Sequence, residues 1–290
     1  MHLKQNLCAI LAAFIWGTAF VAQSVSTDFI EPFTFNALRS IIATAFLLIV
    51  IFLINKKETI SKFKQNKKQL LTGGILAGII LFVAANLQQF GIFEETSAGK
   101  AGFITALYIV LVPVFGLFFK RKAPFTVWIS VLIATVGLYL LCIKESFTVE
   151  LGDFYVFLCS IMFAFHILTI DHFVEKCDSL MLSFVQFFTV SILSLIFALI
   201  FETPNLNNIM HCIFPVLYVG IFSSGIAYTL QIVAQKGSNP TVITLLLSLE
   251  SVFAVLAGAI VLKDVMSVKE LIGCALMFFS VILAQIKTKS

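Results

Sequence analysis

The stretch YTLQIVAQKGSNPTVITLLLSLESVFAVLAGAIVLKD, residues 228–264, consists of two apolar runs joined by the polar segment 235–240. Its second run carries Glu250 near the middle, with long and largely apolar sequence on either side. An ionisable residue at membrane depth is costly, and such residues face a bundle interior or a water-filled cavity rather than lipid. The stretch therefore predicts two membrane-spanning helices, the second with a carboxyl group turned into a helical bundle.

The composition of the whole chain is that of an integral membrane protein. Of its 290 residues, 60% are hydrophobic and 12% are charged, and the mean hydropathy is +1.06. Soluble domains are about one-quarter charged, so these values exclude an ordinary soluble protein. The six cysteines have no ligand spacing, so we expect them to be packing residues with neither a disulfide nor a metal, and we expect no cofactor. The net charge of +4 is concentrated in short loops, so it does not indicate nucleic-acid binding.

Ten apolar runs are each long enough to cross a bilayer, which takes about 20 helical residues. The breaks between them are short and contain proline, asparagine or charged residues, and only 55–69 is a longer polar link. The sequence therefore predicts an all-α integral membrane protein. The ten transmembrane helices are expected at about 7–27, 33–54, 70–92, 101–119, 125–143, 153–172, 179–201, 213–235, 240–262 and 267–286.

Lysine and arginine are distributed unevenly over the predicted loops. If the N-terminus is cytoplasmic, fourteen of the 19 lie on the cytoplasmic side and four on the other, with Arg39 inside a predicted helix. Loops rich in lysine and arginine stay in the cytoplasm. We therefore predict a multi-pass protein of the plasma (inner) membrane with both termini in the cytoplasm.

The two halves of the chain repeat each other. Arg39 aligns with Gln186 at an offset of 147, which other pairs share, and 112–115 aligns with 250–253 at an offset of 138. Each half predicts five helices, and an odd number makes the second half enter the membrane from the opposite face. We therefore expect two inverted repeats with a substrate site near the midplane, where they meet. Their bounds are 1–146 and 147–290.

Several segments together resemble the EamA type of the drug/metabolite transporter superfamily. They are AAFIWGTAF at 12–20, FTFNALRSIIA at 33–43, ETSAGKAGFI at 95–104 with VPVFG at 112–116, and LLLSLESVFAVLAGAIVLKD at 245–264. The resemblance implies that the first four helices of each repeat enclose a central cavity and that the fifth lies outside. It also implies transport of small organic metabolites, often efflux of amino acids or related compounds.

This chain departs from the family pattern in two places. The usual Glu-Pro of the ninth helix is Glu250-Ser251, which removes an expected kink. The acidic residue expected after the fourth helix is replaced by 120–122, a run of three basic residues, whereas the second half keeps Asp264. We therefore do not expect function to depend on a carboxylate after the fourth helix.

Two charged residues inside predicted helices are candidates for ion coupling or an ion pair. Glu250 could take up a proton and so couple transport to a proton gradient, or it could be a permanently neutral or paired structural acid. Arg39 could hold a substrate carboxylate in its bidentate fork, or it could make a scaffold contact. Its repeat partner is the neutral Gln186, so the charge is not part of a symmetric scaffold.

Polar and aromatic helix faces supply the candidates for substrate binding. Trp16, Phe20 and Gln23 share one face, and Thr105 shares another with Tyr108. A lipid-facing surface should be apolar, so these faces should point into the bundle, where they line a cavity or form hydrogen bonds between helices. The predicted substrate-binding residues are Trp16, Asn86, Gln89, Phe90, Tyr108, His166, Tyr228, Gln231 and Ser248.

These observations favour a secondary transporter rather than an enzyme, since neither a nucleotide-binding motif nor a catalytic motif is present in the sequence. We expect it to move a small amphipathic metabolite, such as an amino acid, by alternating access, with efflux as the direction that the resemblance implies. The expected partners are the solute, the lipid bilayer and, as a hypothesis, protons; the oligomeric state stays open. The alternatives are an ion-independent uniporter or exchanger of nucleoside-like or other metabolites, and a small-molecule receptor that does not translocate.

Overall fold

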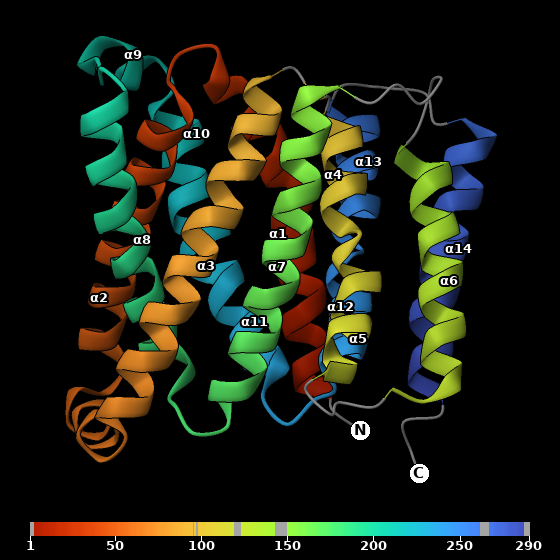
Figure 1. The fold of residues 1–290 in the computed structure, drawn as a ribbon, viewed down its shortest axis with the longest axis horizontal. Coiled ribbons are helices and arrows are strands. Elements are labelled where there is room, and N and C mark those ends of the chain that lie inside the picture. Colours follow the sequence, from red (N-terminus) through yellow and green to blue (C-terminus); the bar gives the residue numbers. More distant parts are fainter. Residues whose placement is uncertain are drawn as a thin grey trace.

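The computed structural model describes residues 3–94, 96, 98–118, 123–142, 150–261 and 267–286, without the side chains of 55–65, 98–99, 142, 257–261 and 286. The basic run 120–122 and Asp264 lie outside the described residues. The described chain is helical almost throughout and contains no β-strand. Its helices stand side by side as one bundle, with α1 beginning and α14 ending at the same end (Figure 1).

Eight helices are long and apolar enough to cross a membrane, and two shorter apolar ones lie at Phe125–Leu141 and Pro240–Leu256. The prediction of an all-α membrane protein with about ten helices is confirmed. The elements in chain order are α1 (Leu3–Thr27), α2 (Pro32–Gln65), α3 (Lys67–Phe93), α4 (Ala98–Ala106), α5 (Tyr108–Phe118), α6 (Phe125–Cys142), α7 (Leu151–Val174), α8 (Ser179–Phe201), α9 (Leu206–His211), α10 (Ile213–Tyr218), the π-helical η1 (Val219–Ala227), α11 (Tyr228–Gln235), α12 (Pro240–Leu247), α13 (Glu250–Val261) and α14 (Val268–Ile286).

The polar link predicted at 55–69 is helical for most of its length, while the membrane-spanning part of the helix ends at Ile54. The helix α2 continues to Gln65, and Asn66 alone separates it from α3. Residues 55–65 contain neither glycine nor proline, so nothing in the segment stops the helix once it leaves the apolar region. The Asn66 side chain donates a hydrogen bond to the carbonyl of Lys176, 2.9 Å away, which ties this turn to the turn after α7.

The helices α6 and α14 pack on each other at one edge of the bundle (Figure 1). A methyl group added at Gly137 would lie 3.0 Å from the carbonyl oxygen of Gly273, and one added at Gly273 would lie 2.8 Å from that of Gly137. Small residues allow membrane helices to approach this closely. The two helices thus form a close pair at the edge of the bundle. This is the place that the resemblance implies for the fifth helix of each repeat.

Two of the membrane-spanning segments are interrupted near their middle. Leu107 separates α4 from α5, and residues 248–249 separate α12 from α13. The sequence predicted that Ser251, in place of proline, would leave the ninth helix unkinked, and this expectation is wrong. The amide of Leu249 bonds to the carbonyl of Leu246 at 3.3 Å, three residues back instead of four, so the α-helix breaks without proline. The break makes Glu250 the first residue of α13.

A third segment changes its helical type rather than breaking. Between α10 and α11, the nine residues of η1 form a π-helix. π-Helical turns inside α-helices are rare and are frequent at functional sites. The segment packs against α1 and α2, so it faces the interior of the bundle.

Candidate functional site

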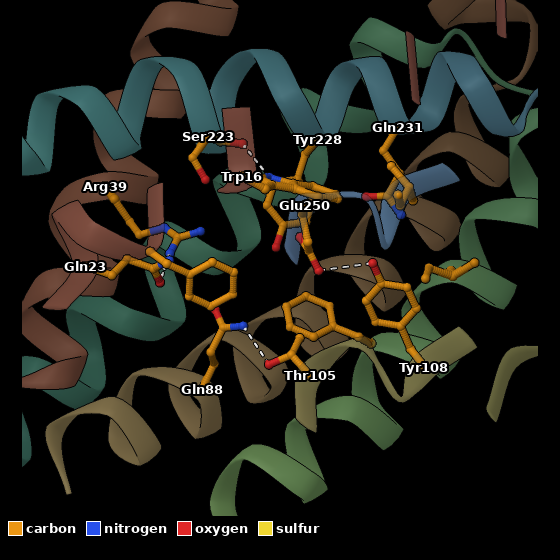
Figure 2. A pocket seen from close by; sticks show the side chains of 14 residues that line it. Trp16, Gln23, Arg39, Gln88, Thr105, Tyr108, Ser223, Tyr228, Gln231 and Glu250 are labelled. Carbon is orange, nitrogen blue, oxygen red and sulfur yellow. Dashed lines mark hydrogen bonds between the residues drawn. The ribbon is translucent and has the colours of Figure 1, made fainter. Parts of the chain in front are cut away.

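A cavity of about 40 Å³ lies inside the bundle. Charged, polar and aromatic side chains converge on this space, so it is a candidate binding site. Its lining comes from α1–α5, α7, η1 and α11–α13 (Figure 2). The lining residues are Trp16, Phe20, Gln23, Arg39, Gln88, Thr105, Tyr108, Phe163, Ile167, Ser223, Tyr228, Gln231, Leu247 and Glu250.

Arg39 brings a positive charge to the cavity from α2. The residue is only 4% exposed. Its Nε donates a hydrogen bond to the Oγ of Ser224 at 3.0 Å, and its Nη1 donates one to the Oε1 of Gln23 at 3.3 Å. No carboxylate of the described residues lies within ion-pair distance of the guanidinium. A buried charge is costly unless it is paired, so this unpaired cation is a candidate binding site for an anionic group.

Glu250 brings an acid to the same cavity. Its Oε1 accepts a hydrogen bond from the hydroxyl of Tyr108 at 3.1 Å, and the residue is 4% exposed. The helix break in front of it is packed on α1: a methyl group added at Gly17 would lie 2.5 Å from the carbonyl oxygen of Glu250 and 2.9 Å from the amide nitrogen of Ala254. Glycine at 17 therefore permits the contact that holds the acid in the middle of the bundle.

An aromatic wall connects the two charged residues. The rings of Trp16 and Tyr228 meet edge to face with centroids 4.8 Å apart. Trp16 is fixed by its Nε1, which donates to the carbonyl oxygen of Ser223 in η1 at 3.3 Å. Figure 2 shows Arg39 with Gln23 at one side of the cavity, and Trp16, Tyr228 and Glu250 in its middle. The wall offers apolar surface between a cation and an acid.

Three amides and the hydroxyls of Thr105 and Ser223 complete the polar part of the lining. The Nε2 of Gln88 donates to the Oγ1 of Thr105 at 3.2 Å, and the Nε2 of Gln231 donates to the Oε1 of Gln235 at 3.2 Å. The Oε1 of Gln231 has no hydrogen-bond partner among the described residues. With Gln23 beside Arg39, the cavity combines charge, hydrogen-bonding groups and aromatic surface, which together suit an amphipathic solute.

Comparisons with known proteins identify the family. The model of the EamA-like transporter family matches residues 3–143 and again residues 150–285. The chain belongs to the EamA-like transporter family. The recognition made from the sequence motifs is confirmed, and the chain is a multi-pass membrane transporter by its family.

Relatives of this EamA-like chain are transporters whose solutes are not named. An uncharacterized transporter of Archaeoglobus fulgidus (strain ATCC 49558 / DSM 4304 / JCM 9628 / NBRC 100126 / VC-16) is 30% identical over 292 aligned residues, which cover 99% of this chain and 87% of the relative. The uncharacterized transporter YrdR of Bacillus subtilis (strain 168) is 29% identical over 168 residues, 55% of this chain and 49% of the relative. A solved crystal structure aligns with a TM-score of 0.81 over 98% of this chain and 97% of its own, at 18% identity, and this likeness shows the fold alone.

The EamA-like bundle brings six of the eleven predicted site residues to the cavity. The other five lie away from its lining, and three of them are on α3. Asn86 accepts a hydrogen bond from the Nδ2 of Asn36 on α2 at 3.0 Å. Gln89 donates to a backbone carbonyl of α1 at 3.4 Å, and Phe90 meets Phe33 edge to face. The six at the cavity are Trp16, Arg39, Tyr108, Tyr228, Gln231 and Glu250.

The remaining two predicted residues make local contacts away from the cavity, and the buried Nδ1 of His166 has no hydrogen-bond partner among the described residues. The Nε2 of His166, which is fully buried, lies 3.0 Å from the Oε1 of Gln186 on α8. Ser248 precedes Glu250 at the helix break and donates to the carbonyl of Leu245 at 2.9 Å. Neither residue belongs to the lining of the cavity.

Several lining residues were not predicted as binding residues. Phe20, Gln23 and Thr105 lie on faces that the sequence pattern had identified, so the signal for them was present. Gln88 is adjacent to the predicted Gln89 but points from another face of α3. For the remaining four, on α7, η1 and α12, no polar helix face in the sequence indicated a place in the cavity. They are Phe163, Ile167, Ser223 and Leu247.

Proposed function

We propose that this EamA-like chain is a secondary transporter that exports a small amphipathic metabolite, such as an amino acid, across the plasma membrane. It works by alternating access of two inverted repeats, 1–146 and 147–290, with both termini in the cytoplasm. One observation carries the proposal: a polar and aromatic cavity inside the bundle is lined equally by the two halves. Seven of its lining residues precede residue 147 and seven follow it.

Contacts between equivalent residues support the two repeats. Thr44 and Ser191 are related by the repeat offset of 147, and their hydroxyl oxygens lie 3.0 Å apart. A residue that contacts its own counterpart lies on a twofold axis, as in an isologous dimer. Gly137 and Gly273, on the fifth helices of the two halves, also contact each other, although their separation of 136 is two residues short of the offset of 138. Both contacts support a twofold axis between the halves.

Packing between helices follows the same relation. The first helix of the first half, α1, packs on η1 and α11, and the first helix of the second half, α7, packs on α3. In both cases a first helix contacts the third helix of the other half. The fourth helix of each half is the interrupted one. Interrupted helices at the interface of inverted repeats are typical of substrate sites in secondary transporters.

The solute class is inferred from the chemistry of the lining. Arg39 and Glu250 bring opposite charges to one cavity, and Trp16 and Tyr228 supply aromatic surface. The Oε1 of Gln231 has no hydrogen-bond partner in the described part of the chain. A solute with separate polar and apolar parts satisfies all of these groups. Glu250 is the acid that we assign to proton coupling, because it faces the cavity and its only hydrogen bond among the described residues is that from Tyr108.

Counterflow in proteoliposomes tests the proposal. Vesicles are loaded with amino acids, nucleosides and polyamines, and entry of each labelled solute is followed with and without a pH gradient. We expect saturable entry of one amphipathic class, accelerated by the matching solute inside. Protein that is folded and inserted but binds solutes without moving them would establish a receptor instead. Entry that does not respond to the gradient would establish the ion-independent uniporter or exchanger.

A further inference from the structure

The guanidinium of Arg39 is held by neighbours that leave part of it free. A guanidinium has five N–H donors. Ser224 and Gln23 accept one each, and Tyr228 is its further polar neighbour. One hydrogen bond to each of these neighbours uses three of the five donors, and the remaining two have no other protein acceptor among the described residues. They belong to a buried cation at the edge of the cavity that has no acid partner in that part of the chain.

We propose that Arg39 is an oxoanion subsite, which binds a carboxylate or phosphate group of the transported solute, and that Ser224 is the residue that aims it. Two parallel N–H groups of a guanidinium match two oxygens of such a group. That the anion belongs to the transported solute rests on the proposed function; that Arg39 binds an oxoanion does not. The subsite thus narrows the solute to one with an anionic group beside an apolar body.

The π-helical segment places Ser224 against the guanidinium. Ser224 is fully buried, and its hydroxyl accepts the hydrogen bond from Nε. The two terminal nitrogens, Nη1 and Nη2, are thereby left to bind an oxoanion together. The segment approaches α2 closely because residue 220 is glycine. A methyl group there would lie 2.7 Å from a side-chain carbon of Ile42 and 3.1 Å from the carbonyl oxygen of Arg39 itself.

Gln23 on α1 fixes the second point of the guanidinium. Its Oε1 accepts from Nη1, so Nε and Nη1 are held from two different helices. A planar group held at two points has a set orientation, and its remaining donors then face the cavity that Arg39 lines. A buried anion site of this kind gains strength from the low dielectric around it. We therefore treat Ser224 as a positioning residue that acts on the solute through Arg39.

A pair of probes with the same shape and different charge tests the subsite. The probes are benzoate and benzamide, with phenyl phosphate to distinguish the two kinds of oxoanion. Binding to the purified protein is followed by the fluorescence of Trp16, which lines the cavity, in a Trp128→Phe background that removes the other tryptophan. We expect benzoate or phenyl phosphate to bind at least about tenfold more tightly than benzamide, or about 1.4 kcal/mol. Equal binding of all three probes overturns the inference.

Variants separate the subsite from the residue that aims it. Arg39→Gln should bring benzoate and benzamide to within about twofold of each other, and Ser224→Ala should reduce the benzoate preference to about threefold, since one of two fixed points is lost. Ser280→Ala removes a buried hydroxyl on α14, which is not part of the lining, and should leave the preference unchanged. Ser224→Gly removes the same hydroxyl and replaces Ser224→Ala if that variant does not fold.

A double-mutant cycle distinguishes positioning from a general structural effect. In an Arg39→Lys background the Nε–H donor is gone, so Ser224→Ala should no longer change the benzoate preference. An equal loss in both backgrounds refutes the positioning role of Ser224 while leaving the subsite intact. If the protein binds benzoate through Arg39 but moves no solute in counterflow, the proposed function fails and the subsite stands.

Discussion

Arg39 and Gln186 occupy equivalent positions in the two halves, and the structure uses them differently. Arg39 lines the cavity and is held by Ser224 and Gln23. Gln186 is fully buried off the cavity, with its Oε1 3.0 Å from the Nε2 of His166. The same place in the repeat thus holds a cation that lines the cavity in one half and a neutral, buried amide in the other.

The difference separates the requirements of the fold from those of the site. Contacts on the proposed twofold axis, such as that between Thr44 and Ser191, need small or polar residues in both halves. A solute has no such symmetry, so the residues that touch it are free to diverge. An arginine in one half and an amide in the other give the cavity one positive end, which would orient a solute with an anionic group.

The largest effect is expected when the first half is made like the second. Arg39→Gln should lower the transport kcat/KM of the solute found by counterflow at least about 100-fold, because hydrogen bonds to a charged group contribute about 1.5–3 kcal/mol each. Gln186→Ala is the matched change in the second half, and we expect it to alter kcat/KM less than about threefold. Equal losses in the two variants would show that position 39 serves the scaffold.

The two buried titratable residues Glu250 and His166 in the second half also differ in whether they face the cavity, and this difference gives the next prediction. Glu250 lines the cavity, whereas His166 does not. Glu250→Gln should abolish accumulation driven by a pH gradient and leave exchange at equal pH, because the amide cannot take up the coupled proton. His166→Gln and the exposed Glu31→Gln should retain accumulation. Accumulation that survives in Glu250→Gln rules out this acid as the coupling group.

A packing difference between equivalent positions gives a smaller effect. Gly17 on α1 corresponds to Ala164 on α7 at the repeat offset, but a methyl group at 17 would overlap the backbone at Glu250. Gly17→Ala should lower the free energy of unfolding by about 1–3 kcal/mol, as overpacking does. We also expect slower transport, since the acid is displaced.

Gly102→Ala is the control for that change, because a methyl group there would meet no atom within 4 Å. It should be neutral or slightly stabilising in the same unfolding measurement, since alanine favours a helix over glycine. If Gly17→Ala is as stable and as active as Gly102→Ala, then the close contact between α1 and the helix break does not hold Glu250 in place.

Much of the fold could be predicted because it depends on length and hydropathy alone. An apolar run of about 20 residues must satisfy its own backbone hydrogen bonds in a membrane, so it spans the bilayer as a helix. Glu250 could be placed inside the bundle for the same reason, since an acid facing lipid is costly. The choice among Asn86, Gln88 and Gln89 could not be made, because periodicity does not say which way α3 is turned about its axis.

The remainder of the site depends on tertiary contacts without a sequence pattern. The π-helical turn of η1 changes the register of its side chains, so the position of Ser224 beside Arg39 does not follow from helical spacing. Trp16 is fixed by a backbone carbonyl, which every residue possesses. The break before Glu250 forms without proline and is packed against Gly17, a contact that joins the two ends of the chain.

The smallest expected effect concerns the contact that the two halves share. Thr44→Ala and Ser191→Ala each remove one hydroxyl from the pair on the proposed twofold axis. Each should lower the free energy of unfolding by no more than about 1 kcal/mol, since hydrogen bonds between membrane helices are worth about 0.6 kcal/mol. The double variant should cost little more than either single one, because the second change removes a partner that is already lost. Thermal unfolding in detergent measures all three variants. Losses that simply add would mean that the two hydroxyls act separately, and the axis would then rest on the reciprocal contact of Gly137 with Gly273.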